Sequence, residues 1–283
     1  MIYGVLNWCF HLTFNYEWAN TIDRYFDYAL RLRDKHQLLQ MGFDFGIGAD
    51  DNQIPSRHRT YIRGLRDRLA AENFIPIIGC GTMELHTDRR VFERSLKLVQ
   101  ECLPIAADLG APVARFFPVF HSRMNHDAQK SLFVEAVNHL ANVACRSGIK
   151  ICSENYEILR LTDFEEILPQ IDPQYGILND IGNWLIMGID PLDGISNLIA
   201  RTVQVHIKDY RLEKGYWRSV ALGEGTIDIP EVIQFLEISQ WGPKIYTVEI
   251  DFDMGDEFEG IDRSLGYLLD LENHLFSSNQ MKR

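Results

Sequence analysis

The sequence predicts a (β/α)8 TIM barrel, in which eight parallel strands are ringed by helices, and three observations support this prediction. Short strand-like runs alternate with longer helical patterns from one end of the chain to the other. Eight such pairs account for the 283 residues at about 35 residues per pair. The main alternative, an open doubly wound sheet, normally carries a glycine-rich turn after its first strand, whereas this chain reads Asn7-Trp8-Cys9-Phe10 there.

Eight short runs of mostly apolar residues, many of them β-branched or aromatic, predict the strands. In order, they lie at residues 2–10, 43–47, 74–78, 113–119, 149–153, 175–178, 202–207 and 245–250. Strands that alternate with helices pair in parallel, because each crossover helix returns the chain to the same end of the sheet. The alternation therefore predicts one closed parallel sheet.

Eight longer segments repeat apolar residues every three or four positions, which predicts helices with one buried face. They lie at residues 17–41, 57–71, 88–109, 127–146, 162–168, 191–200, 230–239 and 257–275. Gly110 and Gly148 follow the third and fourth helices, and Pro230 stands at the first position of the seventh. No linker or change of composition divides the chain, so we expect residues 1–283 to form one domain.

Composition and charge limit the partners of this protein. The 40 acidic and 28 basic residues give a net charge of −12, which repels phosphate backbones, so we do not expect a nucleic-acid partner. The uncharged N-terminal stretch is interrupted by polar residues, and the first cation is Arg24, which argues against a signal peptide or a membrane span. Five scattered cysteines without a CxxC pair exclude a disulfide scaffold and favour a cytoplasmic location.

The last four predicted strands each carry a metal-binding residue type at the carboxyl end, where barrels of this kind form their active sites. These residues are Glu154, Asp180, His206 and Glu249. Each one alone could be a helix cap, a solvated carboxylate or a packed imidazole, but four successive strands with the same feature predict one site. Three carboxylates and one imidazole suit a single divalent cation, with Mn²⁺ expected first and Mg²⁺, Co²⁺ or Zn²⁺ as alternatives.

The same region also carries a family resemblance through five segments. They are Ser153-Glu154-Asn155, Asp180 with Gly182-Asn183, Val205-His206-Ile207-Lys208-Asp209, Leu222-Gly223-Glu224-Gly225-Thr226-Ile227-Asp228 and Glu249-Ile250-Asp251. Together they resemble the xylose-isomerase-like TIM barrel superfamily, and within it the sugar phosphate isomerase/epimerase branch. The resemblance implies that Glu154, Asp180, His206 and Glu249 bind one divalent metal ion. It also implies that Glu154 and Glu249 move a proton next to a carbonyl through an enediolate, so that the protein is an enzyme acting on a sugar, keto-sugar or polyol.

Four further residues are expected to contact the substrate. Lys208 shares the strand parity of His206, although it could instead be a surface lysine paired with Asp209. Asn183 occupies a position where relatives commonly carry a histidine, Arg211 could bind an anionic group, and His11 could form part of the pocket wall. Strand two also departs from the family, since residues 46–51 lack a glutamate that many relatives show.

Three other functions stay open. A dehydratase of the keto-inositol or dehydroshikimate type would share the metal and the first proton abstraction, and would differ only in the loss of a hydroxyl group. An apurinic-site endonuclease would need three metals and additional histidines, which the chain lacks at Asn183. A ligand-binding barrel without catalysis would not need to retain all four ligands. Self-association into a homo-oligomer is also left open.

Overall fold

Eight strands close into a barrel in which every neighbouring pair is parallel, as the sequence predicts. The computed structural model describes residues 1–10, 21–48, 57–156, 159–251 and 257–280. The barrel strands are, in sheet order, β1 (Ile2–Leu6), β2 (Met41–Gly46), β3 (Phe74–Glu84), β4 (Val113–Val119), β5 (Lys150–Glu154), β6 (Tyr175–Asp180), β7 (Thr202–Ile207) and β10 (Ile245–Val248). β10 closes the ring by pairing with β1.

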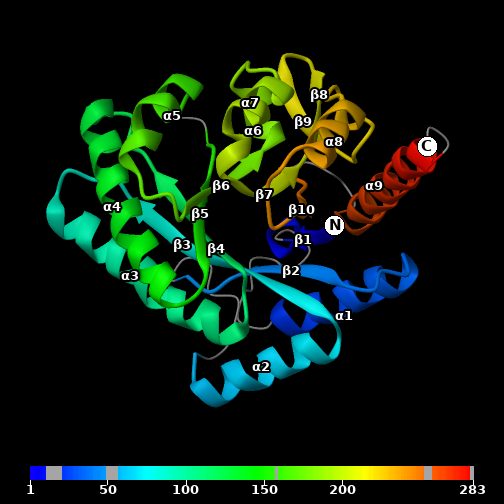
Figure 1. Ribbon diagram of the computed structural model, residues 1–283, viewed down its shortest axis with the longest axis horizontal. Helices are drawn as coiled ribbons and strands as arrows, with labels where there is room; N and C mark the ends of the chain where they lie inside the picture. Colours follow the sequence, from blue (N-terminus) through cyan, green and yellow to red (C-terminus); the bar gives the residue numbers. More distant parts are fainter. Residues whose placement is uncertain (11–20, 49–56, 157–158, 252–256, 281–283) are drawn as a thin grey trace.

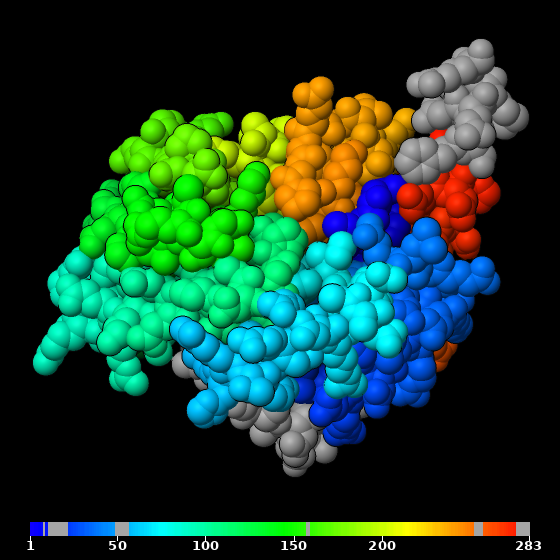
Figure 2. Space-filling view, turned by 60° about the horizontal axis from the view of Figure 1, so that its bottom comes forward, coloured from blue at the N-terminus to red at the C-terminus, as the bar shows by residue number. Residues whose placement is uncertain are grey.

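Helices surround the strands (Figure 1). They are α1 (Thr21–Lys35), α2 (Arg59–Ala71), α3 (Arg89–Leu109), α4 (His126–Arg146), α5 (Leu161–Ile167), α6 (Ile181–Ile186), α7 (Pro191–Leu198), α8 (Ile229–Ile238) and α9 (Glu257–Gln280). The last helix lies beside the beginning of the chain, since red atoms adjoin blue ones in Figure 2 and α9 contacts both β10 and the short 3-10 helix η1 (Asn7–Phe10). Within the described residues, no helix combines the length and apolar character that crossing a membrane requires.

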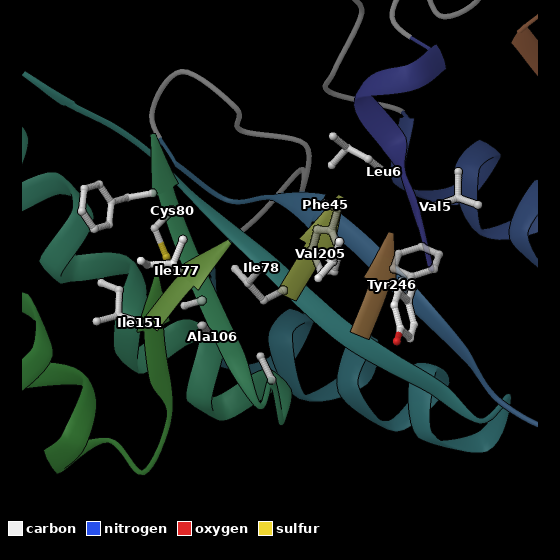
Figure 3. Close-up of a cluster of buried hydrophobic side chains, with 14 of the residues drawn as sticks. Val5, Leu6, Phe45, Ile78, Cys80, Ala106, Ile151, Ile177, Val205 and Tyr246 are labelled. Carbon is white, nitrogen blue, oxygen red and sulfur yellow. The ribbon is translucent and has the colours of Figure 1, made fainter. Parts of the chain in front are cut away.

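The core consists of two apolar layers, one on each side of the strands. A small cluster lies inside the barrel and takes one side chain from each of six strands, namely Ile77, Val113, Cys152, Leu178, Val203 and Ile245. A larger cluster fills the space between the strands and the helices, where Phe45 and Ile78 lie on strands and Ala106 on α3 (Figure 3). Burying both faces of the strands explains why they are continuous apolar runs rather than alternating ones.

Several predicted elements differ in extent from the observed ones, and three of these differences have a clear physical reason. The first strand ends at Leu6, because residues 7–10 form η1, and apolar character alone does not separate a short helix from a buried strand. The third strand continues to Glu84, and its register against β4 shifts between Gly79 and Thr82. The first helix ends at Lys35 rather than at residue 41, since Gln37 has a positive φ of 54°.

A short helix and a two-stranded hairpin were not predicted. Helix α6 starts directly after β6, and Asp180 caps it by accepting a hydrogen bond from the Asn183 backbone N–H. After β7 the chain forms an antiparallel hairpin of β8 (Asp209–Glu213) and β9 (Tyr216–Val220). The buried carboxylate of Asp209 accepts backbone hydrogen bonds from Gly223, Gly225 and Ile227, which holds the segment after the hairpin as a tight turn.

Two helical glycines provide a test of how the helices pack in this fold. A Cβ atom at Gly194 in α7 would lie 2.4 Å from Cγ of the buried Trp184, whereas one at Gly64 in α2 would meet no atom within 4 Å. We therefore expect Gly194→Ala to lower the free energy of unfolding by about 1–3 kcal/mol, as overpacking does. Gly64→Ala should raise it by about 0.5–1 kcal/mol through helix propensity. Urea denaturation of both variants measures this, and equal effects would contradict the packing of α7 on Trp184.

Candidate metal centre and active site

Four neighbouring strands, in the order β5, β6, β7 and β10, bring the four expected metal ligands together. Glu154 and Asp180 are the last residues of β5 and β6, His206 lies on β7, and Glu249 directly follows β10. The strand register pairs Asp180 with His206. One ligating atom from each of the four side chains lies within 4.8 Å of the corresponding atoms of the other three. The four side chains are referred to below as the quartet.

The polar atoms of the quartet fit a divalent cation. Within the described part of the chain, Asp180 Oδ2, His206 Nδ1 and Glu249 Oε2 are buried and make no hydrogen bond. Nδ1 nevertheless lies 2.5 Å from Glu249 Oε2 and 3.7 Å from Asp180 Oδ2. Buried polar atoms without hydrogen bonds are costly, so three such atoms from three ligands, directed at one point, favour a bound cation. The oxygen-rich donor set suits Mn²⁺ or Mg²⁺, and zinc binds such groups as well.

Lys208 lies next to the quartet and partly neutralises it. Its buried ammonium is 3.0 Å from Asp180 Oδ2, 3.2 Å from Glu249 Oε1 and 3.3 Å from Asp251 Oδ2. Burial by itself would lower the pKa of Lys208, but the three negative charges raise it well above its usual value. Lys208 is therefore a fixed positive charge at the edge of the ligand set. It does not have the surface position, paired with Asp209, that the sequence left open.

Two asparagines hold the acidic ligands in place. The Asn155 side chain donates to the Asp180 carbonyl at 3.0 Å and accepts from the Asp180 N–H at 2.5 Å. The Asn183 amide donates to Glu154 Oε1 at 2.7 Å and to the Asn155 carbonyl at 2.9 Å. Asn183 thus contacts a member of the quartet directly. Its amide can position a carboxylate but, unlike a histidine, it does not titrate.

The quartet perturbs the pKa values of its own members. Burial, together with the charges of Asp180 and Glu249, raises the pKa of Glu154 to about 8. Burial opposes a charged His206, yet the carboxylates of Glu249, Asp180 and Glu154 raise its pKa to about 10. Burial also acts against ionised Glu249, but Lys208 and His206 hold the pKa of this carboxyl below its usual value. The crowded charges therefore retain protons that a bound cation would displace.

A polar layer that the sequence did not reveal lies inside the barrel beneath the quartet. Asp44 on β2 forms an ion pair with Arg115 on β4, and Gln204 on β7 donates to Asp44 Oδ2 at 3.0 Å. Arg115 is 13% exposed although it lies on an inward-facing strand position. Burial works against its charge, but Asp44, Glu154 and Glu249 raise the pKa of Arg115 above its usual value. The presence of Arg115 within a predicted strand could have indicated a polar residue inside the barrel. Nothing in the sequence identified Asp44 as its partner.

Arg211, another of the expected substrate contacts, is not part of this arrangement. Arg211 lies on β8 with 51% of its side chain exposed, and its guanidinium is 2.7 Å from Glu213 of the same strand. The hairpin therefore directs it towards an acidic neighbour rather than into the quartet. His11 lies outside the described residues. Tyr210 of β8, which was not expected, donates a hydrogen bond to Asp251 beside Lys208.

Comparison with known proteins places this geometry in context. A family model described as "Xylose isomerase-like TIM barrel" matches residues 36–271. A D-tagatose 3-epimerase-like protein of known structure shares 17% identity and a TM-score of 0.73, with 97% of this chain and 100% of that chain covered. The IolI protein, solved with a zinc atom, shares 15% identity at a TM-score of 0.72, and the coverage is 96% and 98%. No curated protein matches the chain.

A third solved structure is "the probable 3-DHS dehydratase AsbF" of Bacillus anthracis, with 15% identity, a TM-score of 0.71, and 95% and 99% coverage. At these identities the structural likeness shows the fold alone. The family model spans most of the sequence and includes all four strands that carry the quartet. This chain belongs to the xylose isomerase-like TIM barrel family.

Proposed function

We propose that this protein is a divalent-metal-dependent isomerase or epimerase that acts on a small keto-sugar or polyol. The observation that carries the proposal is the convergence of Glu154, Asp180, His206 and Glu249, with three buried ligand atoms that make no hydrogen bond within the described residues. The fold shared with a D-tagatose 3-epimerase-like protein supports the reaction class. Mn²⁺ is the cation proposed first, and Mg²⁺, Co²⁺ and Zn²⁺ are the alternatives.

The positions of the two glutamates suit proton transfer. Glu154 and Glu249 belong to β5 and β10, the two ends of the four-strand arc that also contains β6 and β7. A cation bound by the quartet would polarise a substrate carbonyl as a Lewis acid. One glutamate would then take a proton from the adjacent carbon, and the other would return a proton from the opposite side. Lys208 is proposed to donate a hydrogen bond to a substrate oxygen.

The proposal includes the setting in which the enzyme works. All five cysteines are free thiols, and four of them are buried, which supports the cytoplasm as the compartment. The net charge of −12 argues against nucleic acid as a partner. The proposal is therefore a small-molecule substrate bound by a single barrel domain.

A dehydratase is the second candidate, and the two glutamates could serve it as well. After one glutamate has removed a proton, a protonated glutamate would give its proton to the hydroxyl, which leaves as water. The fold also occurs in AsbF, which is described as "the probable 3-DHS dehydratase". Both candidates share the first step and differ in the fate of the hydroxyl group.

Reaction in deuterated water separates these candidates. With a panel of ketoses, keto-inositols and dehydroshikimate in the presence of Mn²⁺, an epimerase or isomerase that uses proton transfer should incorporate deuterium next to the carbonyl without a new chromophore. A dehydratase should instead produce a more conjugated product, an enone from a ketose or keto-inositol and an aromatic ring from dehydroshikimate, and either change alters the ultraviolet absorption. Isomerisation without deuterium incorporation would indicate a hydride shift and would overturn the role of the two glutamates as acid and base.

Replacing each glutamate by glutamine tests the proton transfer directly. We expect Glu154→Gln and Glu249→Gln each to lower kcat at least about 10²-fold, because each amide keeps an oxygen ligand but cannot accept the proton. Glu213→Gln is the matched control, since Glu213 is paired with Arg211 and Arg218 on the hairpin, and its kcat should stay near the wild-type value. His206→Ala should instead weaken metal binding, so that excess Mn²⁺ partly restores activity. Near-normal kcat in both glutamine variants at saturating Mn²⁺ would refute the mechanism.

The perturbed pKa values predict a proton release when the metal binds. The pKa values of Glu154 and His206, about 8 and about 10, both lie above 7, so each group holds a proton in the metal-free protein at neutral pH. Because a ligand must be deprotonated, Mn²⁺ binding should release about two protons, and affinity should rise with pH between about 6 and 8. Calorimetry in buffers of different ionisation enthalpy measures this number. An affinity that does not change with pH would show that Glu154 and His206 hold no such protons in the metal-free protein.

A further inference from the structure

The ring of His206 is contacted from below by a buried glutamine. Gln204 lies two residues earlier on β7, so its side chain points into the barrel on the same side as His206. Its amide nitrogen is 3.3 Å from His206 Nε2, 3.0 Å from Asp44 Oδ2 and 2.9 Å from Thr247 Oγ1. The amide therefore touches the histidine nitrogen that faces away from the other quartet members.

The partners of Gln204 come from other strands of the barrel. Asp44 comes from β2 and forms an ion pair with Arg115 from β4, while Thr247 comes from β10 and is 3.4 Å from Asp44 Oδ2. Gln204, Asp44 and Thr247 have no exposed surface. Side chains from four strands thus form one interlocked layer beneath the quartet, and this layer adds no ligand of its own.

The two nitrogens of His206 have different surroundings. Nδ1 faces Glu249 and Asp180, so Nδ1 is the nitrogen that can bind a cation shared with them. A neutral imidazole whose Nδ1 binds a metal carries its proton on Nε2 and needs an acceptor there. Gln204 Oε1 is buried and accepts no hydrogen bond within the described residues. The amide beside Nε2 thus holds an unused acceptor.

We propose that Gln204 is a positioning residue for metal binding, which fixes the His206 ring through Nε2 so that Nδ1 faces the cation. The inference rests on the metal site of the proposed function. With the cation on Nδ1, the Nε2–H donates to Gln204 Oε1 after the amide rotates so that Oε1 faces the ring. The amide can take this role because it offers an acceptor as well as a donor.

Three variants test this role, with Mn²⁺ affinity measured by calorimetry. Gln204→Met keeps the length of the side chain but removes both functions, and it should weaken Mn²⁺ binding about 10–100-fold, as loss of a hydrogen bond to a metal-bound histidine does. Gln204→Glu keeps an acceptor and should retain more affinity than Gln204→Met. Thr247→Val is the matched control, because it removes a contact to Gln204 and Asp44 but none to His206, and it should stay within about threefold of wild type.

A spectroscopic readout separates positioning from general stability. In ¹⁵N NMR of the Zn²⁺-loaded wild-type protein, His206 should be metal-bound at Nδ1 and protonated at Nε2. Thermal unfolding of each variant shows whether a loss of affinity comes from unfolding. The inference is overturned if folded Gln204→Met binds Mn²⁺ within threefold of wild type, or if Nε2 is the metal-bound nitrogen. Wild-type protein that binds neither ion would overturn the metal site itself, which is a separate outcome.

Discussion

Buried negative charge at the carboxyl ends of four strands is the constraint on which the rest of the site depends. Glu154, Asp180 and Glu249 place carboxylates within 4.8 Å of one another, and such groups cannot all ionise unless nearby cations compensate them. Lys208, which directly follows β7, supplies one positive charge within 3.0–3.2 Å of two of the three. A divalent cation would supply the rest.

The surrounding hydrogen bonds and ion pairs hold the charged side chains in one arrangement. Asn155 and Asn183 hold the backbone of Asp180 and one oxygen of Glu154, so that the neighbouring strands cannot shift independently. Asp251 and Tyr210 fix the side of Lys208 that faces away from the quartet. Because these groups lie on or directly after strands, the packed barrel rather than a loop sets their positions, which suits a site that must hold ligands accurately.

The two halves of the barrel contribute differently to the interior. Strands β5, β6, β7 and β10 provide the quartet, whereas β2 and β4 provide the Asp44–Arg115 pair beneath it. Below this pair the interior is apolar. The barrel is therefore layered from an apolar base through a neutralised polar layer to an acidic rim, and the middle layer links the first half of the chain to the ligands of the second half through Gln204.

The alternation of strand-like and helical segments was enough to predict the barrel, because the two periodicities differ and parallel strands need crossover helices. The residues at the ends of the last four strands could likewise be predicted to converge, because a closed parallel barrel brings those ends to one rim. The sequence did not predict the hairpin after β7 or helix α6, because these segments are too short for a helical period to be told from a strand period. The contacts across the barrel, from Asp44 to Arg115 and from Gln204 to Asp44, join residues 71 and 160 positions apart. Such contacts depend on strand closure and side-chain packing, which no local pattern in the sequence encodes, and only the tertiary structure decided them.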